Sequence, residues 1–256
     1  MFCVYINEVL LLADGQKIDM MDDKTILQEA FTEMAPRYET LVDGELNRFW
    51  GWRYDQFINR LLEEVDIVDG LSVLDVATGT AMIPKKLIGR YGDSIRIVGL
   101  DITLAMLRRG KKLLDDPNVR LVCGSAMTMP YGTCSFDVVL CGLATHHMDI
   151  PVLISEIRRT LKPGGKLTIA DVGGSAVWRM PIVRFFLKVM AFIYFLTVEN
   201  AARAWAEADG VSNVLCAEDW ANLLSQMGFK GVTVVELPSK FKWIPSPLLI
   251  KATRGG

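Results

Sequence analysis

Short apolar runs alternate with longer, helix-like stretches through the middle of the chain, and this alternation limits the fold more than any other feature. The apolar runs cover residues 73–76, 95–100, 119–123, 136–141 and 167–170. Runs of this length that end at turn residues indicate buried strands. Strands that alternate with helices form a parallel sheet covered on both faces. We therefore predict an α/β fold.

The alternation stops after the fifth predicted strand. Residues 172–213 then form a helical, apolar stretch, which we interpret as a cap inserted after that strand. A short helix over 218–227 and strands at 232–237 and 247–252 complete the chain. The expected fold is a doubly wound, mostly parallel sheet of seven strands.

The part of the chain ahead of the sheet is predicted to be helical over residues 24–65. Residues 1–20 suggest a small hairpin that turns at Asp14-Gly15. No stretch rich in Gly, Ser or Pro separates two domains. We expect an N-terminal extension of residues 1–24, followed by one domain of residues 25–256 that contains the cap.

The charge balance argues against a nucleic-acid partner. The chain has 28 Lys plus Arg and 30 Asp plus Glu, a formal net charge of -2, and no block of like charge. It therefore lacks the basic excess that would neutralise many phosphates. A hydrophobic fraction of 51% without low-complexity tracts indicates a globular protein.

The cysteines and histidines predict no metal site, and the N-terminal residues predict no export. The five cysteines show no C-x-x-C spacing, and the two histidines, His146 and His147, are neighbours. We interpret the cysteines as reduced thiols. The N-terminus carries no Lys or Arg ahead of its apolar run at 9–12, unlike a signal peptide. We expect a cytoplasmic protein without a bound metal.

One apolar segment of the predicted cap resembles a membrane span. Arg179, Arg184 and Lys188 interrupt residues 176–198 and leave an uncharged run too short to span, since a spanning helix needs roughly 20 apolar residues. The segment could touch a bilayer surface through residues 179–198, or cover a substrate as an apolar lid. A core helix is the alternative that we prefer.

Carboxylates and a glycine follow the first two predicted strands. Asp75, Gly79 and Asp101 all fall at the carboxyl edge of the sheet, where doubly wound folds bind ligands. A carboxylate at Asp101 can accept hydrogen bonds from both hydroxyls of a ribose. Ala81 and Pro84 replace the second and third glycines of a dinucleotide fingerprint, which disfavours NAD or FAD. S-adenosylmethionine has a nucleoside but no phosphate, and its ammonium group suits Asp75.

Five motifs give these residues a family context. In order and spacing they resemble the class I S-adenosylmethionine-dependent methyltransferases, and within them the ubiquinone/menaquinone C-methyltransferase branch. The resemblance covers roughly residues 31–237. The motifs lie at residues 73–80, 98–102, 124–131, 135–139 and 161–165.

The resemblance implies where the cofactor binds. Asp75 would lie near the amino group of S-adenosylmethionine, which is converted to S-adenosylhomocysteine as product. Asp101, with Ile102, would bind the ribose, and Tyr38 would lie over the cofactor as part of a lid. The methionine part would be held by Ala77, Thr78 and Gly79.

Two positions depart from the family pattern. Ser125 replaces the acidic residue that usually meets the adenine amino group, so that Ser125, Ala126 and Met127 would form the adenine site. Ala81 replaces the usual last glycine of the loop and is expected to add a methyl group close to the cofactor. Both departures predict weaker or altered cofactor binding.

Candidate catalytic groups follow the fourth and fifth predicted strands. His146 and His147 come after residues 136–141, and Asp171 ends the adjacent strand. A neutral imidazole can take a proton from an attacking oxygen, and Asp171 could orient it. The alternative is that one imidazole only caps the sheet edge or binds the cofactor, while proximity and orientation supply the acceleration.

The leading hypothesis is methyl transfer to an oxygen or activated carbon of a lipophilic small molecule, such as a quinol or polyketide. The aromatic residues at 185–195, where relatives carry a substrate-specific cap, favour such an acceptor. A cyclisation or rearrangement without net methyl transfer is the alternative, motivated by Ala81 and Ser125. A non-catalytic partner subunit is a third reading. The oligomeric state is open, with a homodimer as one option.

Overall fold

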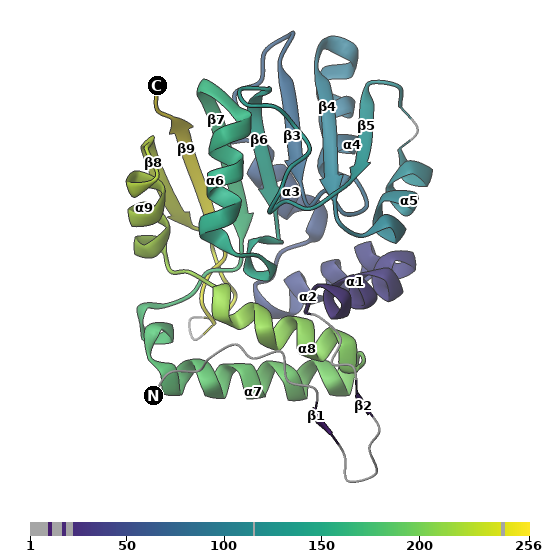
Figure 1. Ribbon diagram of the computed structural model, residues 1–256, viewed down its shortest axis with the longest axis vertical. Helices are drawn as coiled ribbons and strands as arrows, with labels where there is room; N and C mark the ends of the chain where they lie inside the picture. The colour runs from purple at the N-terminus through teal and green to yellow at the C-terminus, as the bar shows by residue number, and fades with distance from the viewer. Residues whose placement is uncertain (1–9, 12–16, 19–22, 115, 242–243) are drawn as a thin grey trace.

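The computed structural model describes residues 10–11, 17–18, 23–114, 116–241 and 244–256 (Figure 1). Within them, one seven-stranded sheet has the order β5-β4-β3-β6-β7-β9-β8. Strand β9 is antiparallel to β7 and β8, and the other neighbours are parallel. This confirms the predicted fold class. The strands are β3 (Ser72–Val76), β4 (Arg96–Asp101), β5 (Val119–Cys123), β6 (Phe136–Gly142), β7 (Leu161–Asp171), β8 (Phe229–Glu236) and β9 (Leu248–Arg254).

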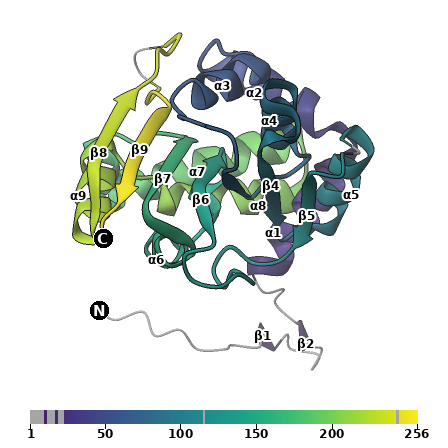
Figure 2. The same cartoon turned by 90° about the horizontal axis from the view of Figure 1, so that it is seen from above.

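Successive residues of each inner strand face opposite layers of the molecule. Val73 packs with side chains of α3 (Tyr54–Leu62), α4 (Met82–Tyr91) and α5 (Leu104–Leu113). Its neighbour Leu74 belongs to the apolar cluster on the other face, which also contains side chains of α6 (Ile150–Thr160) and α9 (Ala217–Gln226). Figure 2 shows α3 and α4 on one side of the sheet and α6 on the other. The continuous apolar runs of the sequence are therefore strands buried on both faces.

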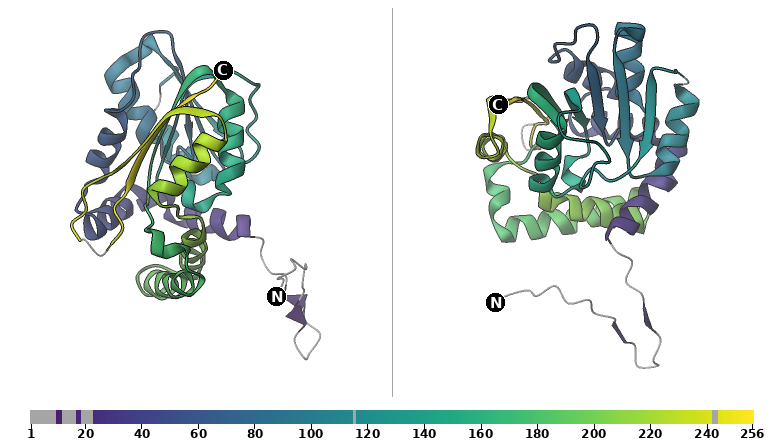
Figure 3. Two further views of the ribbon diagram at one scale, coloured as in Figure 1. Left: turned by 90° about the vertical axis from the view of Figure 1, so that its left-hand side faces the viewer. Right: turned by 45° about the horizontal axis from the view of Figure 1, so that its top comes forward.

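Four further helices lie at the carboxyl edge of the sheet. They are α1 (Asp23–Met34), α2 (Tyr38–Phe49), α7 (Pro181–Val198) and α8 (Ala201–Gly210). Helix α8 contacts both α1 and α7, and α7 is the outermost of the four (Figures 1 and 3). Short 3-10 turns η4 (Ala176–Arg179) and η5 (Val211–Asn213) connect α7 and α8 to the rest of the domain.

The order of the strands places a crevice between β3 and β6. From β3 the chain continues to β4 and β5 on one side and then returns to β6 on the other side. The loops after β3 and β6 therefore diverge, and ligands of doubly wound folds bind in the space between them. The edge that carries this crevice is the one that the four helices cover (Figure 1).

Two local features differ from or extend the sequence predictions. Strand β7 begins at Leu161, ahead of the predicted strand at 167–170, because a register shift against β6 absorbs the additional residues as an irregularity of the strand. The hairpin predicted for residues 1–20 is confirmed in its two strands, β1 (Leu10–Leu11) and β2 (Lys17–Ile18), which pair antiparallel. Its predicted turn at Asp14-Gly15 lies outside the described residues.

Helix α7 is not the core helix that we preferred. Only Phe195 of its 18 residues is buried, because α8 covers one side of α7 and no described element covers the other. By length and composition alone α7 also qualifies as a candidate membrane span, although the interrupting basic residues suggested that the segment was too short. It is the only such helix among the described residues.

Candidate active site

A narrow cavity lies at the carboxyl ends of β3, β4 and β6. Five residues predicted for the cofactor site line it, together with His147: Tyr38, Ala77, Gly79, Asp101 and Ile102. Gly79 has φ +56°, and a Cβ there would meet Met106 Cε at 3.4 Å and Tyr38 Cε1 at 3.9 Å. The side chains of Met106 and Tyr38 thus lie over Gly79 and narrow the cavity.

Asp101 has the geometry of a ribose ligand. Its Oδ2 accepts a hydrogen bond from the Gly79 N–H at 2.8 Å, and its Oδ1 accepts one from the Thr103 N–H at 2.8 Å. These bonds fix the carboxylate, and each oxygen keeps a second lone pair for a ligand hydroxyl. Burial raises the pKa of Asp101, which its two backbone hydrogen bonds oppose. The two hydroxyls of a bound ribose would donate two further hydrogen bonds to the ionised Asp101 carboxylate.

Asp75 is buried and incompletely paired. The Thr78 hydroxyl donates to Asp75 Oδ2 at 2.5 Å, whereas Asp75 Oδ1 has no partner among the described residues. Burial raises the pKa of Asp75 to about 8. A buried acceptor without a partner suits a ligand ammonium group, since an unsatisfied buried polar atom is costly. Neither Asp75 nor Thr78 lines the narrow cavity itself.

The remaining predicted residues lie outside the cavity wall. Ser125, Ala126 and Met127 do not line it, and the Ser125 hydroxyl accepts a hydrogen bond from the Met127 N–H at 3.1 Å. Ala81 is fully buried and also absent from the wall. A Cβ on Gly110 of α5 would lie 3.1 Å from the Ala81 methyl group. That methyl group therefore faces α5, and the expectation that it crowds the cofactor is wrong.

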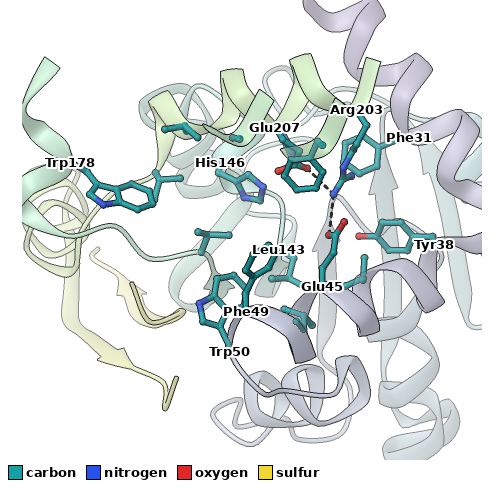
Figure 4. Close-up of a pocket in the computed structure, with 18 residues that line it drawn as sticks. Phe31, Tyr38, Glu45, Phe49, Trp50, Leu143, His146, Trp178, Arg203 and Glu207 are labelled. Atoms are coloured by element: carbon teal, nitrogen blue, oxygen red, sulfur yellow. Dashed lines mark hydrogen bonds and ion pairs between the residues drawn. The ribbon is translucent and has the colours of Figure 1, made fainter. Parts of the chain in front are cut away.

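A second cavity of about 260 Å³ adjoins the first and shares with it Phe31, Tyr38, Leu143 and His147. Its walls come from α2, from the turn after β6 and from the helices of residues 172–213 (Figure 4). Most of the lining is apolar or aromatic, which is typical of a site for a lipophilic small molecule. The aromatic side chains of this lining are Phe31, Tyr38, Phe49, Trp50, Trp178 and Phe195.

The two histidines form the turn η3 (Thr145–His147) at this junction, and the first of them pairs with Asp171. His146 Nδ1 lies 2.9 Å from Asp171 Oδ1, while Asp171 Oδ2 accepts hydrogen bonds from the backbone N–H and hydroxyl of Thr145. Burial alone would lower the pKa of His146, but the Asp171 carboxylate outweighs it, so that the pKa lies above its ordinary value. The structure thus brings His146 and Asp171 together at the sheet edge.

His147 has a different carboxylate partner and the opposite pKa shift. Its Nε2 lies 3.5 Å from Oε1 of Glu207, a residue of α8. Burial and the neighbouring His146 lower the pKa of His147, although Glu207 opposes the shift. His147 is therefore neutral at neutral pH and can accept a proton. It lines both cavities, whereas His146 lines only the larger one.

Known proteins resemble this chain in sequence. A family model described as "Methyltransferase domain" matches residues 74–169. The chain is 26% identical over 210 residues to a demethylmenaquinone methyltransferase of Renibacterium salmoninarum, covering 75% of this chain and 83% of the relative. The chain is an S-adenosylmethionine-dependent methyltransferase. This match also confirms the predicted branch and S-adenosylmethionine as the cofactor.

Solved structures show the same fold at low sequence identity. The [4+2]-cyclase SpnF has a TM-score of 0.71 at 15% identity, over 92% of this chain and 97% of that chain. Phosphoethanolamine N-methyltransferase 2 of Haemonchus contortus, in complex with phosphomonomethylethanolamine and S-adenosylhomocysteine, has a TM-score of 0.64 at 15% identity. That alignment covers 94% of this chain and 62% of the other. Both likenesses concern the fold alone.

The methyltransferase has a buried charge network that sequence reasoning missed. Arg203 Nη2 lies 2.8 Å from Glu207 Oε1 and 3.2 Å from Glu45 Oε2, so that it joins α8 to α2 (Figure 4). Its guanidinium carbon also lies 5.5 Å from the ring centre of Phe31 and 5.2 Å from that of Phe195. Burial would raise the pKa of Glu207, but Arg203 and His147 hold it well below its usual range.

The sequence did hold one signal for this network. Arg203 and Glu207 are four residues apart, among alanines at 204, 206 and 208 that are themselves buried. A charged pair at this spacing shares a helix face, and small residues beside it indicate a face packed against protein. Glu45 gives no such signal, because on α2 it resembles an ordinary solvent-facing acid.

Three side chains of the methyltransferase have the spacing of metal ligands. Donor atoms of His146, His147 and Glu207 all lie within 4.8 Å of one another. Arg203 already neutralises the Glu207 carboxylate, and Asp171 occupies one nitrogen of His146. A cation at this position would be repelled by the guanidinium group, so the cluster fits proton transfer better than metal binding.

Proposed function

We propose that this enzyme transfers a methyl group to an activated carbon of a phenol- or quinol-type ring held in the 260 Å³ cavity. The observation that carries the proposal is the position of His147, which borders both the cofactor cavity and the larger, aromatic-lined one. The demethylmenaquinone methyltransferases among the relatives support a ring of this kind. Transfer to the ring oxygen is the second candidate, because the same ionised hydroxyl would attack.

His147 would act as the general base. Glu207 pairs with Nε2 of His147, which leaves Nδ1 of His147 as the nitrogen that can accept a proton. The ring hydroxyl gives its proton to His147, and the ionised oxygen raises the electron density of the adjacent ring carbon. S-adenosylmethionine, when bound, supplies the methyl group on a positively charged sulfur. The ring carbon forms the new C–C bond as the bond between the methyl group and sulfur breaks, and the ring oxygen becomes a carbonyl. The same carbon then loses its hydrogen as a proton to solvent, which restores the aromatic ring, and His147 returns its proton to the ring oxygen.

His146 and Asp171 would support this step without taking the proton. Asp171 holds His146 through Nδ1, and the raised pKa keeps the imidazole protonated to higher pH than an ordinary histidine. A protonated imidazole beside the cavity stabilises the negative oxygen that forms when the ring ionises. Asp171 itself is fixed by Thr145, so the pair is oriented before an acceptor arrives.

The test combines product analysis with a variant of the base. The wild-type enzyme should convert S-adenosylmethionine to S-adenosylhomocysteine with a naphthoquinol that lacks its ring methyl group, and mass spectrometry should place the new methyl group on carbon. His147→Asn should lower kcat about 100-fold because the general base is lost. Calorimetry should show little change in the affinity for S-adenosylmethionine.

The pH profile provides an independent check. Activity requires neutral His147, so it falls as the pH drops through the pKa of this residue. Because that pKa is lowered from 6.5, the acid limb of kcat/KM should lie below pH 6.5. Consumption of an acceptor without any S-adenosylhomocysteine would contradict the proposal and favour the cyclisation alternative. Full activity of His147→Asn would remove the residue from the mechanism.

A further inference from the structure

Helix α7 carries an uninterrupted apolar stripe on its outer side. The stripe side chains are between 39% and 66% exposed, and they follow the three- and four-residue spacing of one helix face. Only 6% of the helix is buried, and its mean hydropathy is 1.8. The stripe consists of Ile182, Phe185, Phe186, Val189, Met190, Ile193 and Leu196. So large an apolar face on one element marks an interaction surface.

The helix is held flat against the domain at both ends. Before it, Arg179 pairs with Glu218 and Asp219 of α9. After it, Glu199 pairs with Arg37 at 2.7 Å. Figures 1 and 3 show α7 lying across the carboxyl edge with α8 between it and the sheet. In this position α7 cannot cross a bilayer, but its whole outer side can lie on one.

The charges of the segment suit a lipid surface. Residues 176–198 contain three basic residues and no acidic residue. Arg179 and Lys188 pair with carboxylates of α9 and α8, which leaves Arg184 as the base without a carboxylate partner among the described residues. The stripe itself has no charged side chain, and an interfacial helix buries such a face about 5–10 Å below the headgroups. The exposed Trp205 of α8 adds an amphipathic side chain of the type enriched where headgroups meet hydrocarbon.

A second copy of the chain fits this face less well. The stripe offers seven side chains of one helix, whereas a standard protein interface takes about 20–30 residues from each partner. A stable protein dimer buries about 800 Å² on each partner. The stripe alone is therefore too small for a stable dimer, whereas insertion into lipid needs no matching protein surface.

The opposite side of the same element reaches the larger cavity. Ala191 and Phe195 of α7, with Trp178 just before the helix, line that cavity. We propose that the stripe of α7 docks the enzyme on the surface of a lipid bilayer and so presents the cavity to acceptors dissolved in it. The docking depends on the surface alone, whereas the delivery of a lipophilic acceptor rests on the proposed function.

The docking is tested by flotation with vesicles of phosphatidylcholine and phosphatidylglycerol. The wild-type protein should float with the vesicles, and the double variant Phe186→Asp, Met190→Asp should partition about 100-fold less, because two large apolar side chains are lost from the membrane contact. Val68→Asp with Leu113→Asp is the matched control. It makes the same kind of change at exposed apolar side chains outside the cap and should float like the wild type.

Each outcome separates the docking from the chemistry. A wild-type protein that stays with the soluble fraction, or a double variant that floats equally well, would overturn the docking. A concentration-dependent dimer that the double variant dissolves, without flotation, would assign the stripe to a second copy instead. The double variant should still methylate a water-soluble quinol. If the wild type floats but methylates no quinol, the docking stands and the proposed function fails.

Discussion

The two adjoining cavities are built in different ways. The proposed cofactor side, the narrow cavity, is lined mainly by loops that directly follow strands, and backbone N–H groups of Gly79 and Thr103 hold Asp101, its proposed ribose ligand. The acceptor side is formed by helices distant in sequence, and the side chain of Arg203 ties two of them together through Glu45 and Glu207. The cofactor side is therefore fixed by the sheet, whereas the acceptor side depends on how the cap is seated.

The largest effect should come from removing the tie between the helices. Arg203→Met removes the buried cation that pairs with the carboxylates of Glu207 and Glu45. Breaking a buried ion pair in this way costs about 3–5 kcal/mol. Denaturant unfolding of the ligand-free protein should show a loss of this size.

Arg60→Met is the matched control for that loss. Arg60 also pairs with two carboxylates, Glu63 and Glu64, but on the surface of the domain, where such pairs contribute less than about 1 kcal/mol. Equal losses in the two variants would remove the distinction between a tied acceptor side and an ordinary charged surface.

The next effect concerns the cofactor side. Asp101→Ala should weaken binding of S-adenosylmethionine about 100-fold, since two hydrogen bonds to a charged acceptor are lost. Asp93→Ala, at an exposed position before the same strand, should bind normally. Calorimetric titration measures both. Unchanged binding by Asp101→Ala would mean that the ribose is held elsewhere, and the cofactor side would not be fixed by strand-end loops.

The smallest effect tests how the cap influences the base. Glu207→Gln should lower kcat about tenfold, because the negative charge beside His147 Nε2, which would stabilise the imidazole as it takes up a proton, is lost. Glu207 raises the pKa of His147, so its removal should lower that pKa and move the acid limb of the pH profile to lower pH. Glu45→Gln also takes a carboxylate from Arg203 but does not touch His147, and should leave the acid limb in place. An acid limb at the same pH in both variants would contradict the influence of Glu207 on the pKa of His147.

Sequence reasoning was most successful where local rules decide the structure. The strand at Val73–Val76, the loop through Gly79 and the next strand ending at Asp101 follow from apolar runs, turn residues and spacing. Parallel strands bring their carboxyl ends to one edge, so the pairing of His146 with Asp171 could also be anticipated. These predictions needed no knowledge of how distant helices pack.

The remaining features depend on packing that no local pattern encodes. Ala81 was expected to crowd the cofactor, but the direction of its methyl group is set by α5, which comes close at Gly110. Helix α7 was preferred as a core helix because of its composition. Its own residues do not indicate which elements pack against it, and in the structure α8 covers only one side. Glu207 could not be assigned to His147 because the fold, not the spacing, joins the cap to the turn after β6.

The position of α8 has a consequence for the order of events in a catalytic cycle. One helix brings Glu207 to the proton acceptor, closes the acceptor side through Arg203 and supports α7 from behind. Any movement of α8 wide enough to admit a bulky ring would also withdraw Glu207 from His147. Loading that displaces α8 would therefore separate Glu207 from His147, and in the proposed mechanism the two residues would pair again only after α8 has returned.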